Sequence, residues 1–125
     1  ETLASSSGAT FATVLTPTAL ESALQAADGP ALVYVTADWC TICRSIERGP
    51  LADPAVVAAL EPLTRIKVDV TDFGADSQAL LNQLASVGPP TMVFLDTMQT
   101  ERPGTRLIGE IDSAELLHSA ERVLP

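Results

Sequence analysis

The chain has 125 residues, 46% of them hydrophobic, so it is long and apolar enough to bury the core of one folded domain and is not a disordered chain. Its net charge of −9 argues against a nucleic-acid-binding protein and against adsorption to an anionic membrane surface. No apolar run approaches the roughly 20 residues of a membrane span, so we expect no membrane insertion of this segment.

The N-terminal end of the chain changes character near residue 10. Residues 1–10 are small and polar and predict a flexible arm or linker, which leaves 11–125 as the folded domain. A short edge strand is expected at 11–15. Thr16 then caps a helix that has Pro17 at its first position.

An uninterrupted apolar segment follows at 31–35 and predicts a buried strand. This strand leads into Cys40-Thr41-Ile42-Cys43 at the start of a helix, which Gly49-Pro50 ends. Asp53 caps a further helix that continues to Leu60.

The second half of the chain continues to alternate predicted strands with predicted helices. The expected elements are a strand at 63–70, a helix around Leu80, a turn at 87–90, strands at 91–95 and 105–108 that form an antiparallel hairpin, and a last helix capped by Asp112. This order predicts an α/β fold with a central mixed sheet and helices on both faces.

Cys40 and Cys43 are the only two cysteines. A strand that delivers a Cys-x-x-Cys to a helix start is typical of a redox-active dithiol, in which one thiolate attacks a partner's disulfide and the other resolves the mixed disulfide. The alternatives are a zinc site and an inert or stapling pair. Zinc needs about four ligands and the chain adds only His118, so no metal is expected. A staple across so short a loop contributes only about 2 kcal/mol.

Five short segments resemble the C-terminal thioredoxin-like domains of the DsbD family of thiol:disulfide interchange proteins. They are Ala37–Cys43, 53–56, 68–71, 88–91 and 94–96. The resemblance runs from about Phe11 to the C-terminus. It implies a thioredoxin fold that needs no cofactor other than a redox-active Cys40–Cys43 disulfide.

The resemblance also implies a place in the cell. It predicts a domain excised from a membrane protein, on the periplasmic side of a bacterial inner membrane. This domain relays electrons as a reductant from the membrane-embedded part to the N-terminal periplasmic domain and contributes to cytochrome c biogenesis. We expect a monomer. The alternatives are a free-standing thioredoxin-like reductase of the cell envelope and a non-catalytic thioredoxin-like binding module.

The helix that begins at the cysteines sets their expected roles. Cys40 faces the positive end of the helix dipole, which favours its thiolate, so we expect it to be the nucleophile. Cys43 lies one turn inward and is the expected resolving thiol. Glu47 falls on the same helix face, where its charge raises the pKa of Cys40. DsbD domains carry an acid at the matching position; the alternative is a solvated glutamate.

Tyr34 departs from the family pattern. The family usually carries a buried acid six residues before the first cysteine, and a phenol is a poor proton acceptor at neutral pH. Two further residues are expected to tune the site. Arg44 partly offsets Glu47 or is simply an exposed helix residue, and Asp38 tunes the thiols or is a solvated loop acid.

The second site element is the turn before Thr91. The family pattern puts a cis proline at Pro90, packed against the cysteines. Pro89 has no N–H, so it offers a docking partner only its carbonyl. We expect Trp39 to form a partly exposed partner-binding platform beside Cys40 rather than to pack in the core.

Overall fold

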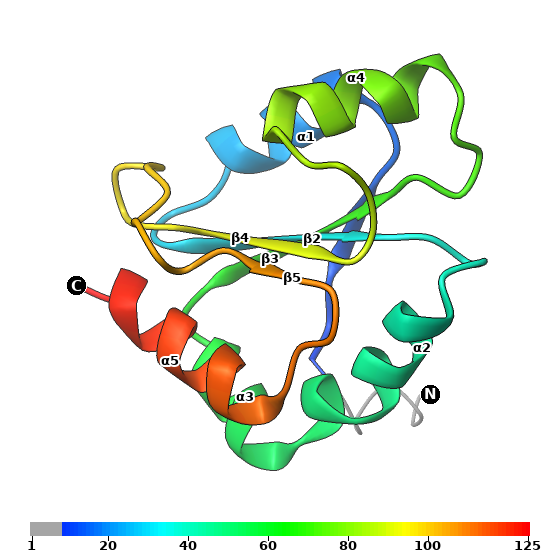
Figure 1. Ribbon diagram of the computed structural model, residues 1–125. Helices are drawn as coiled ribbons and strands as arrows, with labels where there is room; N and C mark the ends of the chain where they lie inside the picture. The colour runs from blue at the N-terminus through cyan, green and yellow to red at the C-terminus, as the bar shows by residue number, and fades with distance from the viewer. Residues whose placement is uncertain (1–8) are drawn as a thin grey trace, which may run out of the picture.

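The computed structural model describes residues 9–125, which form a five-stranded sheet between two layers of helices (Figure 1). The strands are β1 (Ala12–Val14), β2 (Ala31–Thr36), β3 (Thr64–Asp69), β4 (Thr91–Leu95) and β5 (Leu107–Ile108). The helices are α1 (Pro17–Gln25), α2 (Thr41–Arg48), the short 3-10 helix η2 (Pro50–Ala52), α3 (Pro54–Leu60), α4 (Ala75–Leu84) and α5 (Ser113–Val123). These elements confirm the predicted α/β architecture.

The sheet is mixed, with the strand order β1-β3-β2-β4-β5. Strands β1, β3 and β2 run parallel, whereas β4 runs antiparallel to β2 and pairs with β5 as the predicted hairpin. All six residues of the central strand β2 are buried. Burial on both faces explains why this strand appears in the sequence as an uninterrupted apolar run.

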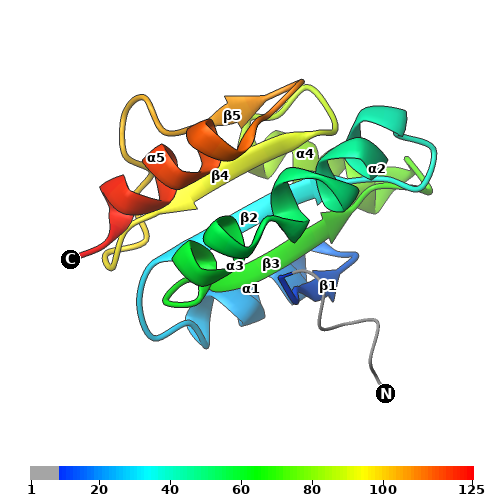
Figure 2. The same cartoon turned by 90° about the horizontal axis from the view of Figure 1, so that it is seen from below.

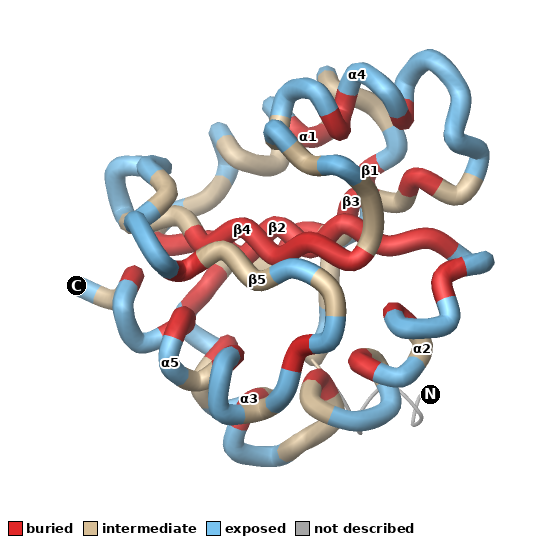
Figure 3. Tube along the Cα trace, in the orientation of Figure 1, coloured by how far each residue is buried: buried red, intermediate tan, exposed pale blue. Residues whose placement is uncertain are grey.

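The helices cover both faces of the sheet (Figures 1 and 2). Helices α1 and α4 lie on one face, and α2, α3 and α5 lie on the other. Figure 3 shows that the buried residues concentrate in the sheet and on the helix faces turned towards it. The three predicted caps are present, since the side chains of Thr16, Asp53 and Asp112 each accept a hydrogen bond from a first-turn backbone N–H.

The largest boundary difference is in the last hairpin. The sequence predicts a strand at 105–108, but β5 covers only its last two residues. The carbonyl oxygen of Thr105 accepts a hydrogen bond from Ser119 Oγ on α5 at 2.8 Å. Because this carbonyl is bonded to the helix layer, the chain joins the sheet only from Leu107.

The predicted N-terminal arm lies mostly outside the described residues, which exclude 1–8. The backbone N–H of Ala9 donates to the Leu51 carbonyl at 3.3 Å, and Arg65 Nε donates to the Thr10 carbonyl at 2.8 Å. Hydrogen bonds to the folded domain therefore already occur at residues 9 and 10, while the domain boundary itself stays a prediction. Within 9–125, no helix combines the length and apolar character needed to cross a bilayer.

Candidate active site

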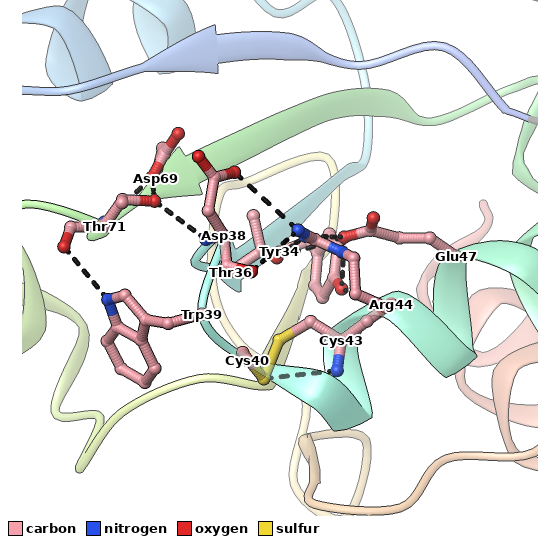
Figure 4. A network of polar contacts seen from close by, with 10 residues as sticks. All are labelled: Tyr34, Thr36, Asp38, Trp39, Cys40, Cys43, Arg44, Glu47, Asp69 and Thr71. Atoms are coloured by element: carbon pink, nitrogen blue, oxygen red, sulfur yellow. Dashed lines mark hydrogen bonds and ion pairs between the residues drawn. A yellow bond between two sulfur atoms is a disulfide. The ribbon is translucent and has the colours of Figure 1, made fainter.

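The two cysteines lie where the loop after β2 enters α2 (Figure 4). Cys40 is the N-cap residue, and its Sγ accepts a hydrogen bond from the backbone N–H of Cys43 at 3.1 Å. The pair forms a disulfide, with the Cα atoms 5.2 Å apart. Cys40 keeps 7% of its surface exposed and Cys43 none. This order of exposure agrees with the expected roles of nucleophile and resolving thiol, which stay predictions.

A polar cluster centred on Glu47 lies beside the disulfide (Figure 4). Its Oε2 accepts hydrogen bonds from Tyr34 Oη and Thr36 Oγ1, both at 3.0 Å, and from Arg44 Nη2 at 3.1 Å. Burial acts to raise the pKa of Glu47, but the hydrogen bonds from Arg44, Tyr34 and Thr36 outweigh burial and lower it. Glu47 is therefore a carboxylate at neutral pH.

Tyr34 connects this cluster to the cysteine helix. Its hydroxyl donates to Glu47 and also lies 3.4 Å from the backbone carbonyl oxygen of Cys43. Burial raises the pKa of Tyr34 well above its ordinary range, and the charge of Glu47 raises it further. Tyr34 therefore stays a protonated donor. Among residues 9–125, no hydrogen bond joins Glu47 directly to either sulfur, so any influence on the thiols is electrostatic or passes through Tyr34 and α2.

Arg44 balances the charge of Glu47. Its Nη2 donates a hydrogen bond to Glu47 Oε2. Its Nη1 donates to the Asp38 carbonyl oxygen at 3.2 Å and lies 3.7 Å from the Asp38 carboxylate. The hydrogen bond to Glu47 raises the pKa of Arg44. With 34% of its side chain exposed, Arg44 is a half-buried member of the cluster rather than an exposed helix residue. The Asp38 carboxylate is largely exposed, and its tuning role stays a prediction.

Trp39 is 55% exposed, as expected for a platform beside Cys40. Its Nε1 donates to the Thr71 carbonyl at 2.9 Å, and its ring packs edge-on against Phe73, with the centroids 6.1 Å apart. The backbone N–H of Asp38 donates to Thr71 Oγ1 at 2.8 Å. The loop after β3 thus holds Trp39 at the surface, while its role in binding a partner stays a prediction.

The peptide bond between Pro89 and Pro90 is cis, as the family resemblance implies. Val35 near the end of β2 pairs with Thr91 at the start of β4, so this turn lies at the same end of the sheet as the cysteine loop. The Pro90 carbonyl is not free, because it accepts a hydrogen bond from the backbone N–H of Gly109 at 3.2 Å.

Sequence reasoning missed Thr36, Thr71 and Phe73. The strand pattern offers a signal for Thr36, because it lies two residues after Tyr34 and therefore on the same face of β2. Thr71 and Phe73 come from a loop distant in sequence, so no local pattern connects them to Trp39. Within the described part of the chain, no cluster of three or more His, Cys, Asp or Glu side chains is arranged to hold a metal ion.

Two curated relatives of this chain share one name, the thiol:disulfide interchange protein DsbD. The chain is 35% identical over 115 residues to the thiol:disulfide interchange protein DsbD of Pectobacterium atrosepticum and 33% identical over 120 residues to DsbD of Ralstonia nicotianae. The aligned regions cover 92% and 94% of this chain but 20% of each relative. The chain therefore spans about a fifth of the length of these proteins.

Solved structures show the same fold. The oxidised C-terminal domain of Neisseria meningitidis DsbD superposes with a TM-score of 0.75 at 24% identity, over 90% of this chain and 99% of that one. A thioredoxin variant from Halobacterium salinarum gives 0.67 at 25% identity, over 90% and 88%. The thioredoxin family profile matches residues 11–122. With its Cys-x-x-Cys disulfide at the start of α2, the chain belongs to the thioredoxin family.

Proposed function

We propose that this domain is a thiol:disulfide oxidoreductase that acts as a reductant. The observation that carries the proposal is the placement of Cys40 Sγ at the N-terminus of α2, where the backbone N–H of Cys43 points at it. A thiolate at this position accepts that hydrogen bond and faces the positive end of the helix dipole. Cys40 keeps 7% of its surface exposed and Cys43 none, which favours Cys40 as the residue that a partner's disulfide reaches first.

The exchange proceeds in two steps. The Cys40 thiolate attacks one sulfur of the partner's disulfide, which forms a mixed disulfide and releases the partner's other sulfur as a thiolate. The Cys43 thiolate then attacks Cys40 Sγ, which closes the intramolecular disulfide and releases the partner's second thiolate. The domain loses two electrons and the partner disulfide gains them. Cys43 loses its thiol proton to solvent before its attack, and the partner's released thiolates take up protons from solvent.

We further propose that the domain works as a relay in a DsbD-type protein on the periplasmic side of a bacterial inner membrane. Similarity to DsbD proteins over more than nine-tenths of this chain supports this assignment. The membrane-embedded part supplies the electrons and the N-terminal periplasmic domain accepts them. Trp39, Pro89 and Pro90 contact the partner, while Glu47, Arg44, Tyr34 and Asp38 tune the thiols.

The test is equilibration of the purified domain with a series of glutathione redox buffers, followed by single-turnover reduction of a DsbD N-terminal domain. A reductant has a potential well below that of glutathione and transfers electrons to this partner rapidly. A domain that exchanges with neither glutathione nor the partner is a binding module with a resting disulfide, which contradicts the proposal. Rapid exchange with general protein disulfides but not with the N-terminal domain indicates a free-standing reductase.

A further inference from the structure

A groove of about 410 Å³ begins at the cysteine helix and extends to the start of α5. One wall comes from α2 and Pro50. The other comes from the segment between β5 and α5, which runs beside α2 in Figure 1, and from the first turn of α5. The lining residues are Ile42, Ser45, Ile46, Pro50, Glu110, Ile111, Asp112 and Glu115. Ile42 lies between the two cysteines in sequence, so one residue of the groove wall is a chain neighbour of the disulfide, although neither cysteine lines the groove.

The groove combines an apolar lining with negative charge. Ile42, Ile46, Pro50 and Ile111 supply the apolar surface, and Ile42 is 40% exposed. Glu110, Asp112 and Glu115 supply three carboxylates, and none of the described residues that line the groove is a lysine or arginine.

These carboxylates are not neutralised by neighbouring cations. In the part of the chain that the structure describes, no ion pair involves Glu110, Asp112 or Glu115. Of the two arginines on α2, Arg44 is paired with Glu47 and Asp38, and Arg48 forms no ion pair with the groove carboxylates. Asp112 and Glu115 each accept one backbone hydrogen bond in the capping box, which leaves their charges in place.

We propose that this groove binds a cationic segment of the protein that exchanges disulfides with Cys40, with an apolar side chain on the isoleucines and a lysine or arginine against the carboxylates. The inference rests on the proposed function and specifies its partner. Charge complementarity carries it, because acidic rims accelerate association with basic surfaces and disfavour acidic ones. A second copy of this chain is a poor occupant, since each copy carries a net charge of −9.

A second hollow on the same end of the molecule has the same sign of charge. It is lined by the aspartates Asp38, Asp69, Asp72 and Asp76, and it shares Asp38 and Thr71 with the surroundings of Trp39. Asp38 and Ile42, each within two positions of Cys40, therefore line two separate hollows that both carry carboxylates. The groove at α2 differs in having an apolar lining, which suits a side chain of the docking segment.

The experiment measures how fast the reduced domain reduces three symmetric peptide disulfides. Each peptide carries leucine next to its cysteine. The three peptides differ only in the flanking residue, which is lysine, glutamine or glutamate. We expect the lysine peptide to be reduced about fivefold faster than the glutamate peptide at low ionic strength, with glutamine between them. The ratio should approach one at about 1 M salt, where the Debye length is about 3 Å.

The variant Glu110→Gln/Glu115→Gln tests the groove itself. Glutamine is accepted at the third position of a capping box, so α5 keeps its cap. The lysine-to-glutamate ratio should fall to about twofold or less in this variant. The matched control, Glu21→Gln/Glu121→Gln, removes the same charge from exposed positions that do not line the groove and should keep the ratio.

The outcomes separate the two proposals. Equal reduction of all three peptides overturns the groove proposal and leaves the oxidoreductase intact. A charge preference that survives Glu110→Gln/Glu115→Gln also overturns it, because the preference then arises elsewhere, with the aspartate-lined hollow as the next candidate. Failure to reduce any of the peptides overturns the proposed function, and the groove proposal with it.

Discussion

The hydroxyl of Tyr34 donates a 3.0 Å hydrogen bond to the carboxylate of Glu47, which joins the central strand to the cysteine helix. Tyr34 occupies the position where the family resemblance places a buried acid. In this chain the carboxylate beside the cysteines comes from α2, and the strand supplies a neutral donor that holds it. The Tyr34 hydroxyl also lies 3.4 Å from the Cys43 carbonyl oxygen, so a single phenol contacts both the Glu47 carboxylate and the backbone of Cys43.

Replacing Tyr34 with phenylalanine isolates this hydroxyl. The ring should keep its packing against Phe11, whose centroid lies 5.9 Å away, while Glu47 loses one of its three donors. We expect a loss of about 1–2 kcal/mol in the free energy of unfolding, measured by urea denaturation, and a rise in the pKa of Glu47, measured by NMR titration. Thr36→Val removes another donor and should shift the Glu47 pKa in the same direction. An unchanged Glu47 pKa in Tyr34→Phe contradicts a functional hydrogen bond.

The lowered pKa of Glu47 predicts how stability depends on pH. A group whose pKa is lower in the folded than in the unfolded state binds fewer protons when folded, so stability rises with pH. Its contribution is complete above the ordinary value of 4.5 and is lost as the pH falls through the folded pKa. Wild type should therefore be more stable than Glu47→Gln at pH 7, and the difference should shrink below about pH 4.5.

This comparison controls for the other acidic groups. Asp96 also has a lowered pKa, because Arg102 donates a hydrogen bond to it, but that pair is present in both proteins and cancels in the difference. Urea unfolding at a series of pH values provides the measurement. A stability difference that is constant from pH 7 to well below pH 4.5 means that the Glu47 charge does not stabilise the fold.

Arg44 should set how strongly Glu47 acts on the thiols. In Arg44→Gln the carboxylate keeps its charge but loses the cation that balances it, so the Cys40 thiolate is disfavoured and exchange with glutathione disulfide slows. Glu47→Gln leaves Arg44 without its carboxylate partner and should favour the thiolate. Thiolate absorbance against pH measures both effects.

The matched control for Arg44 is Arg48→Gln. Arg48 is an exposed residue in the last turn of the same helix, and replacing it with glutamine removes the same formal charge as Arg44→Gln does. It should change the Cys40 thiolate titration less than Arg44→Gln does, because exposed charges beyond a Debye length of about 10 Å are largely screened. Equal effects of the two variants indicate that the net charge of α2, rather than the Arg44–Glu47 pair, controls the thiols.

Local sequence patterns predicted the α/β architecture and the strand and helix that carry the two cysteines, whereas the thioredoxin fold and the cis bond before Pro90 were implied by the family resemblance. The buried run at 31–35, the caps and the Cys-x-x-Cys each depend on neighbouring residues, and β2 and α2 formed where these patterns indicated. The helix period placed Glu47 on the same face as the cysteines, but it did not reveal that its three donors come from two elements. The strand period puts Tyr34 and Thr36 on one face of β2. That this face meets Glu47 depends on how α2 packs against β2, which no local pattern gives.

The parts that local patterns missed depend on long-range contacts. The loop carrying Thr71 and Phe73 holds Trp39 only because β3 lies beside β2 in the sheet. The groove near Ile42 exists because the segment at Glu110 runs beside α2. Neither arrangement leaves a periodicity or a motif in the sequence.

The roles of the two cysteines can be separated by trapping. Cys43 is fully buried and Cys40 retains a small exposed edge, so an incoming disulfide should meet Cys40 first. Reduced Cys43→Ser, mixed with the disulfide form of a DsbD N-terminal domain, should accumulate a mixed disulfide because no thiol remains to resolve it. Cys40→Ser should form little, since its remaining thiol is shielded. Non-reducing electrophoresis and mass spectrometry of the adduct measure both, and equal trapping by the two variants contradicts Cys40 as the nucleophile.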